Sequence, residues 1–317
     1  MSQHDPALRR PNPPFQAEPN TAVLLLAHGT PDTLDEIPEY LSNVTAGRLL
    51  PSAVVEEIQH RYALVGPSPL TRITHLQGQL LSTYLGVPVY VGMRNWKPYI
   101  ADAIREMRAN GVRKFAAICL APQNSRTSVG LYRRAVFEES GDMAVDFTET
   151  WADHPLLAEA FADRLRDVWT PGTPVIFTAH SVPVRTLEGE PGHPADPYAD
   201  EAKHTAALVA SLVGVPSSEC FFAFQSQGAS GGEWIGPSVE ETISMLHLQE
   251  IRRVIVQPIG FLCDHIEILY DIDIAFRQFA GGLGIKLVRP QSLNESLLLI
   301  RTLEDLARNA LTRLAEQ

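Results

Sequence analysis

Two histidines stand at equivalent places in two similar stretches of the sequence. His28 lies in the motif AHGTP and His180 in the motif AHSVP, and each motif follows a run of apolar residues that is typical of a buried strand. A neutral imidazole at a strand end can accept a proton or bind a divalent transition metal. One such histidine is more often a hydrogen-bonded structural residue, but the repetition favours a chemical role.

The densest cluster of polar residues is DHIEILYDID, at positions 264–273. Glu267 and Asp271 are four residues apart and would share one face of a helix, where like charges repel. Such a pair does not stabilise a helix, but it is well suited to passing a divalent cation or protons from one carboxylate to the next. Glu267 stands in an apolar stretch, so we expect burial to raise its pKa and make it a proton acceptor. With His180 it offers a ligand pair suited to Fe²⁺, Co²⁺, Zn²⁺ or Mn²⁺, whereas His265 could simply cap its own helix.

Alternating strands and helices must position these residues, and they occur in the same order in both halves of the chain. The pattern predicts an α/β fold of two similar Rossmann-like domains with parallel sheets and a cleft between them. Because ligands bind beyond the carboxyl ends of parallel strands, His28 and His180 would approach one cleft from opposite sides. The predicted strands are 22–26, 87–93, 114–122, 174–180, 220–226 and 252–261, and the predicted helices are 98–111, 155–168, 236–249 and 294–314.

The chain has 317 residues, and we divide it into a disordered tail (1–20), an N-terminal domain (21–170) and a C-terminal domain (171–317). Its formal charge of −11 argues against nucleic acid as a partner. No apolar run approaches the ~20 residues that span a bilayer. The three cysteines are isolated, which predicts reduced thiols in a cytoplasmic protein and no iron–sulfur cluster. The glycine-rich loop 227–236 lacks the phosphate-binding fingerprints, which disfavours a nucleotide-dependent enzyme.

Several longer motifs resemble those of the ferrochelatases, the enzymes that insert ferrous iron into a porphyrin. The C-terminal half carries TAHSVP, FQSQGASGGEWIGPS and VIVQPIGFLCDHIEILYDIDI, and the N-terminal half carries NVTAGR, RYALVGPSPLTRIT and LAPQNSRTSVGLYRRA. The resemblance runs from about residue 23 to residue 290. It implies a lyase of haem biosynthesis whose two Rossmann-like domains enclose a porphyrin cleft.

The resemblance also implies roles for individual residues. His180 and Glu267 would be the catalytic pair and would bind the metal, and Asp271 would continue the acidic line as a further metal ligand. His28 stands at a position where, by the resemblance, members of the soluble bacterial branch carry a tyrosine that can ligate iron axially. At this position the chain would offer an axial imidazole instead. The residues that would line the porphyrin site are His28, Thr45, Arg61, Tyr62, Ser68 and Tyr132.

Besides His28, three positions depart from the family pattern. Thr45 falls where relatives carry arginine, which would remove one propionate contact. Asn95 stands where relatives often have histidine. Ala275 replaces a third carboxylate, so we expect a weakened outer metal site.

The polar lip at residues 32–42 and the NVTAGR motif resemble the soluble branch that uses coproporphyrin III, which we favour over protoporphyrin IX. Ferrous iron and the porphyrin are the expected substrates, and no organic cofactor is needed because the reaction changes no redox state. We expect a monomer with at most peripheral membrane contact. The alternatives are a cobalt chelatase of the same fold, which two histidines and a glutamate would suit, and a non-catalytic haem-binding protein.

Overall fold

The computed structural model describes residues 15–189, 194–228 and 232–316, which contain two four-stranded parallel sheets. The first sheet has the order β2-β1-β3-β4, and the second has the matching order β6-β5-β7-β8. The predicted pair of similar α/β units is therefore confirmed. The strands are β1 (Thr21–Ala27), β2 (Val89–Met93), β3 (Lys114–Cys119), β4 (Ala144–Thr148), β5 (Val175–His180), β6 (Cys220–Gln225), β7 (Arg253–Pro258) and β8 (Lys286–Val288).

The central strand of each sheet is apolar along its length because helices cover both of its faces. All seven residues of β1 are buried, and so are the first five of β5. On the first sheet, α4 (Ile100–Ala109) and α5 (Val129–Ser140) cover one face, and α3 (Leu70–Leu85) packs against the other. On the second sheet, α8 (Val239–Leu248) and α9 (Arg277–Gly282) share one face.

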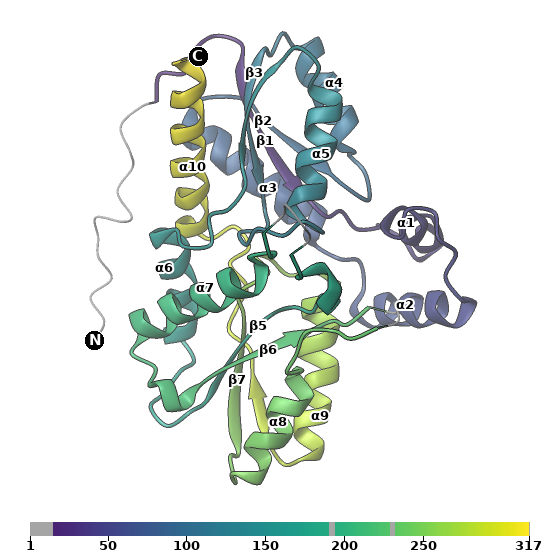
Figure 1. Ribbon diagram of the computed structural model, residues 1–317, viewed down its shortest axis with the longest axis vertical. Helices are drawn as coiled ribbons and strands as arrows, with labels where there is room; N and C mark the ends of the chain where they lie inside the picture. The colour runs from purple at the N-terminus through teal and green to yellow at the C-terminus, as the bar shows by residue number, and fades with distance from the viewer. Residues whose placement is uncertain (1–14, 190–193, 229–231, 317) are drawn as a thin grey trace.

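One hydrophobic core joins the two halves. It contains Leu25 of β1 and Phe177 of β5, together with apolar side chains of α6 (Pro155–Arg166) and α7 (Tyr198–Val213). Figure 1 shows α6 and α7 between the two sheets, so the sheets are held by a shared layer of helices.

The last helix, α10 (Leu297–Ala315), returns to the first sheet. It packs on α3, α6, β3 and β4, and it is the yellow helix beside the upper strands in Figure 1. Arg313 of this helix pairs with Asp146 of β4, with Nε 2.8 Å from Oδ2. The predicted boundary at residues 170–171 stays a prediction, and α10 follows it in the chain while packing on the sheet that precedes it.

The predicted tail 1–20 lies only partly within the described residues, and its final part is packed rather than disordered. The guanidinium of Arg308 lies 5.2 Å from the centre of the Phe15 ring. Nζ of Lys114 lies 3.0 Å from a carboxylate oxygen of Glu18. Phe15 thus contacts α10 and Glu18 contacts β3, which corrects the prediction of disorder for residues 15–20. Residues 1–14 lie outside the described residues.

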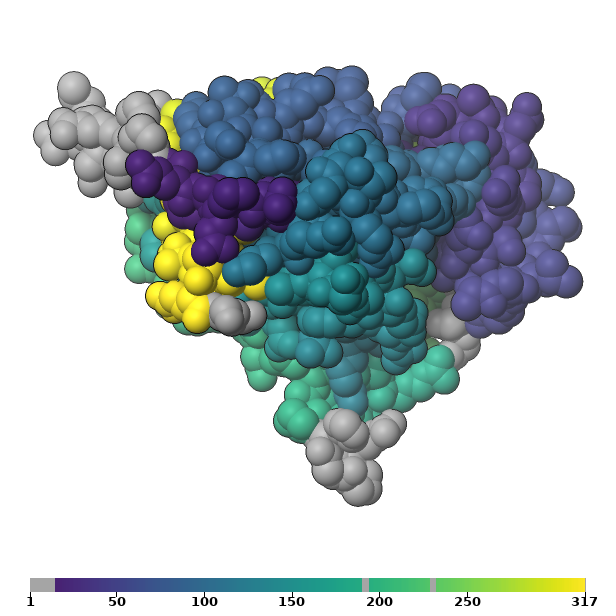
Figure 2. Space-filling view, turned by 90° about the horizontal axis from the view of Figure 1, so that it is seen from above, coloured from purple at the N-terminus to yellow at the C-terminus, as the bar shows by residue number. Residues whose placement is uncertain are grey.

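A lip of helices stands beside the two sheets, on the right of Figure 1, and forms the purple lobe on the right of Figure 2. It consists of a short 3₁₀ turn (Leu34–Glu36), α1 (Ile37–Val44) and α2 (Ser52–Val65). Ile37, Tyr40 and Leu41 of the lip pack with Tyr62 and Trp96 in a separate small core. The lip is therefore anchored from within. Its exposed side chains include the acidic Asp35 and Glu39 and also the apolar Leu34, Val44 and Leu64. No helix in the described ranges is long and apolar enough to cross a membrane.

Candidate active site

A cavity of about 340 Å³ lies where the carboxyl ends of β1 and β5 meet. His28 directly follows β1, and His180 is the last residue of β5. Both side chains line this cavity, as the repeated motif predicted. Its polar lining includes His28, Tyr62, Ser68, Arg94, Gln123, Tyr132, His180, Tyr198, His265 and Glu267.

His180 and Glu267 face each other across 3.5 Å, measured from Nε2 to Oε2. Nδ1 of His180 lies against the backbone carbonyl of Ser181, which can only accept a hydrogen bond, so Nδ1 carries the proton. In the neutral ring Nε2 then presents a lone pair to a carboxylate oxygen, and that oxygen has no hydrogen-bond partner among the described residues. Two acceptors facing each other call for a cation between them, either a proton or a metal ion.

The pKa of Glu267 differs from the expectation. Burial is the largest single influence and raises it, but His180, His265, His28 and Ser226 together outweigh burial and hold the pKa of this carboxyl below its usual value. The predicted rise is therefore wrong, because His180 and His28, which are distant in sequence, converge on the carboxylate together with the neighbouring His265. Glu267 is a carboxylate at neutral pH and suits a metal ion.

Asp271 lies behind Glu267 and outside the cavity wall. Both belong to a π-helix, η5 (Glu267–Phe276), whereas the argument from their four-residue spacing assumed an ordinary helix. The Ser226 hydroxyl donates to Oδ2 of Asp271, and Arg61 lies 3.6 Å from Oδ1. Burial, followed by the charge of Glu267, raises the pKa of Asp271 to about 6. The two carboxylates thus form a line that leads from the cavity toward α2.

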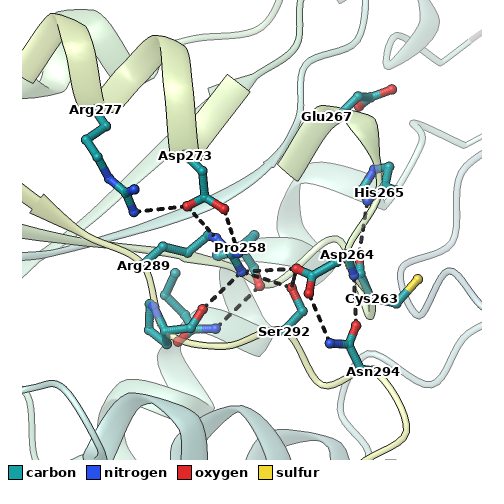
Figure 3. Close-up of polar contacts among 12 residues, drawn as sticks. Pro258, Cys263, Asp264, His265, Glu267, Asp273, Arg277, Arg289, Ser292 and Asn294 are labelled. Atoms are coloured by element: carbon teal, nitrogen blue, oxygen red, sulfur yellow. Dashed lines mark hydrogen bonds and ion pairs between the residues drawn. The ribbon is translucent and has the colours of Figure 1, made fainter. Parts of the chain in front are cut away.

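A network of polar side chains fixes the loop before Glu267 (Figure 3). Asp264 accepts hydrogen bonds from Ser292 Oγ (2.7 Å) and Asn294 Nδ2 (3.0 Å), and Asn294 Oδ1 accepts one from the Asp264 backbone (2.9 Å). Arg289 bridges Asp264 and Asp273, at 3.2 and 2.7 Å. The C-terminal segment after β8 therefore braces the start of the π-helix.

His265 does not cap its helix. Its Nδ1 lies 3.0 Å from the carbonyl of Cys263, and its ring packs on Phe261 with centroids 4.7 Å apart. The imidazole therefore adds to the cavity wall beside Glu267.

The opposite wall holds His28. The Asn95 amide nitrogen lies 3.1 Å from both ring nitrogens, and the Tyr40 ring meets the imidazole edge-on at 6.1 Å. Burial, followed by the charge of Arg94, lowers the pKa of His28 to about 3. This imidazole is neutral at physiological pH, and a neutral ring can act as an acceptor or ligand.

The cavity wall includes His28, Tyr62, Ser68, Tyr132, His180 and Glu267 but not the other three predicted residues. Asp271 and Arg61 form the outer pair described above. The Thr45 hydroxyl lies 2.9 Å from the carbonyl of Leu41 and 2.7 Å from that of Arg48, at the end of α1. Its role as a porphyrin contact stays a prediction.

Sequence reasoning missed Arg94, Gln123 and Tyr198. Arg94 directly follows β2, so the strand-end argument that selected His28 also applies to it. Its guanidinium lies 5.1 Å from the Tyr132 ring centre, and its buried Nε has no hydrogen-bond partner within the described ranges. No carboxylate of those ranges lies within 4 Å of it. Among the residues that the structure describes, this cation of the site therefore has no anionic partner.

In the described part of the chain, no three histidine, cysteine, aspartate or glutamate side chains form a ready-made metal centre. His180 and Glu267 offer two ligands and leave the remaining coordination positions of a metal open. Such a site suits an ion that is passed on better than one that is kept.

Comparison with known proteins gives consistent results. Residues 20–311 match the family model described as ferrochelatase. The chain is 57% identical to a protein named ferrochelatase from Acidobacterium capsulatum, over 94% of this chain and 96% of that one. It is 31% identical to a coproporphyrin III ferrochelatase of Bacillus cereus, over 90% and 92%.

Among solved structures, the cobalt complex of the sirohydrochlorin chelatase SirB from Bacillus subtilis subspecies spizizenii has a similar fold. Its TM-score is 0.60, with 10% identity over 94% of this chain and 98% of that one.

Proposed function

This chain belongs to the ferrochelatase family, the lyases that insert iron into a porphyrin, and we propose that its porphyrin is coproporphyrin III. The observation that carries the chemistry is the His180–Glu267 pair, two acceptors that face each other at 3.5 Å inside a cavity.

The preference for coproporphyrin III has two supports. Several relatives, including the Bacillus cereus protein, are named as coproporphyrin III ferrochelatases. Within the described residues, the buried Nε of Arg94 in the cavity has no hydrogen-bond partner, and a propionate would supply one.

We assign His180 and Glu267 to the chemical step. Insertion removes two pyrrole protons and delivers Fe²⁺ to four nitrogens. His180 accepts a proton through Nε2 or first holds the metal there, because Nδ1 is already committed to the Ser181 carbonyl. Glu267, which is ionised before the step, accepts the second pyrrole proton and passes it to Asp271 along the acidic line.

The cavity walls shape the ring for this step. A flat porphyrin hides its nitrogen lone pairs in the ring plane, and a buckled ring exposes them. A cleft that fits the buckled form favours the transition state over the substrate. His28 faces the ring from the first half and is proposed as an axial ligand of the iron once it has entered.

The reaction as proposed uses no organic cofactor, because iron remains ferrous throughout. The small-molecule partners are the porphyrin and Fe²⁺.

The decisive experiment is anaerobic incubation with Fe²⁺ and either coproporphyrin III or protoporphyrin IX, followed by absorption spectra over time. We expect a higher kcat/KM for coproporphyrin III. A clear preference for protoporphyrin IX, or activity that depends on added membranes, would overturn the substrate assignment.

His28 is the one observation that favours a second candidate, a cobalt chelatase of the same fold, because a two-histidine site also suits Co²⁺. The same assay with Co²⁺ and a reduced corrin precursor discriminates the two. Binding of haem without metal insertion would instead support a carrier protein.

A further inference from the structure

The first turn of α7, together with Asp196 just before it, forms a polar seam between the two halves. It meets the loop at residues 120–128, which follows β3 and forms part of the cavity wall. The backbone N–H of Asn124 donates to Glu201 and that of Arg126 donates to Asp196, both at 2.7 Å. Hydrogen bonds from backbone amides to carboxylates are among the stronger ones in proteins. The loop of one half is therefore fastened to the helix of the other.

Asp196 is the central residue of this seam. Its side chain is 1% exposed, and its two oxygens bind donors from different halves. Oδ2 accepts from the Arg126 backbone, and Oδ1 accepts from the Tyr198 backbone at 3.0 Å. The Arg126 side chain lies 3.7 Å from Oδ2, and its Nη2 also donates to the carbonyls of Thr186 and Glu188. A buried carboxylate with this many donors holds its neighbours in one arrangement.

Tyr198 links the seam to the catalytic strand. Its hydroxyl donates to the backbone carbonyl of His180 at 3.0 Å, and its ring is buried against the cavity. Contacts therefore run without a break from the first-half loop through Asp196 and Tyr198 to His180. The mechanism assigned above uses neither of these two residues.

We propose that Asp196 and Tyr198 are positioning residues, which hold His180 at its working distance from Glu267 and from the first-half wall. The proposal rests on the role assigned to His180. The physical reason is that the reacting groups come from two halves of the molecule, so a shift along the seam changes their separation. A misplacement of about 1 Å can cost ~10²-fold in rate.

Tyr198→Phe tests the last contact with the least disturbance, since it removes one hydroxyl. We expect kcat for iron insertion to fall about tenfold while KM for coproporphyrin III stays within about twofold. The matched control is Tyr90→Phe, which also loses a single hydrogen bond, from Asn110 at 3.0 Å, outside the cavity lining. The control should keep the wild-type kcat. If Tyr198→Phe keeps the wild-type kcat, or changes only KM as a direct porphyrin contact would, the proposal is wrong.

Asp196→Asn tests the first contact, because an amide nitrogen must then face one of the two backbone N–H donors. We expect the same kcat loss, and the double variant should lose no more than the worse single variant, since both act through His180. Losses that multiply would contradict a shared path. Should Asp196→Asn fail to fold, the comparison of Tyr198→Phe with Tyr90→Phe decides alone.

His180→Ala is measured in parallel, because it distinguishes a failure of the catalytic role of His180 from a failure of the positioning role of Tyr198. Turnover in His180→Ala would overturn the catalytic role of His180. An inactive His180→Ala beside a fully active Tyr198→Phe would overturn only the positioning role.

Discussion

Glu267 remains ionised although its own burial opposes the charge. The nearby histidines and Ser226 together outweigh burial, so the carboxylate serves as a partner for positive charge. We expect Glu267→Gln to lower kcat by ~10² or more, because the amide cannot carry that charge. The melting temperature should change little, since Oε2 makes no hydrogen bond in the described fold. Turnover assays and thermal melts on one preparation check this. A lowered melting temperature with intact turnover would make Glu267 a structural residue.

Asp271 should affect how the stability of the fold depends on pH. Its folded-state pKa of about 6 lies above the usual aspartate value of 3.8, so the folded state binds more protons between these values. Stability therefore falls as pH rises from about 4 to 6, and Asp271→Asn removes that fall. Melting temperatures of the metal-free protein across this range measure the effect. Asp102→Asn is the control, because Asp102 sits in an exposed ion pair with Arg105. Parallel curves for wild type and Asp271→Asn would contradict the assignment.

His28 differs from His180 in the step it serves. An axial bond forms fully only after iron is in the ring, so it holds the product and contributes little to insertion. His28→Ala should keep much of the insertion rate, shift the absorption spectrum of bound product and release it faster. His28→Tyr should give a phenolate-like ferric spectrum. If His28→Ala is as inactive as His180→Ala and its product spectrum is unshifted, His28 is a proton acceptor or entry ligand.

For single residues, the sequence was informative about those that directly follow a predicted strand. His28 and His180 were found because each follows a recognisable apolar run. Arg94 was open to the same reasoning and was overlooked. The pKa of Glu267 was beyond such reasoning, because the histidines that lower it come from both halves of the chain.

At the scale of elements, the turn after β1 is the tightest junction near the site. Gly29 has φ of +87°, and a Cβ placed there would lie 2.9 Å from the Trp96 backbone nitrogen. Gly29→Ala should destabilise the fold by about 2–4 kcal/mol, through left-handed strain and overpacking.

The control for the overpacking is Gly47→Ala, with φ of +81° and no neighbour within 4 Å. It bears only the strain of about 1–2 kcal/mol. Urea unfolding of both variants gives the difference. Equal losses of unfolding free energy in the two variants would mean that Trp96 moves aside without destabilising the fold.

Elements with local signals were predictable, and those decided by distant contacts were not. Buried strands and capped helices follow from apolar runs and end residues such as Ser238, whose hydroxyl accepts from the Glu241 backbone at the start of α8. The π-helix looks like an ordinary helix in sequence. Residues 15–20 look like a polar tail until Phe15 meets Arg308.

At the scale of the whole molecule, the cavity lies at the seam, so a bound porphyrin touches both halves. Coproporphyrin III should therefore raise the melting temperature of the whole protein in one transition. At a free concentration of ~100 Kd the gain is about 2.7 kcal/mol. Calorimetry with and without the porphyrin measures it. Two separating transitions, with only one shifted, would place the porphyrin on a single half.

The repeated order of strands predicted two similar units and a shared cleft, but not how the chain closes. The amphipathic pattern of α10 is the same as that of any helix at the end of a chain, so it does not predict which sheet the helix covers. Only the fold shows that its apolar side completes the core of the first sheet.

That return has a consequence for how the protein is made. The ribosome finishes β4 at residue 148, while the helix that covers the same sheet begins at residue 297. At 5–20 residues per second, the nascent first half waits roughly ten to thirty seconds with one sheet face incompletely covered. During translation this half is exposed to aggregation, and a chain cut short before α10 leaves an apolar surface for chaperones and proteases to recognise.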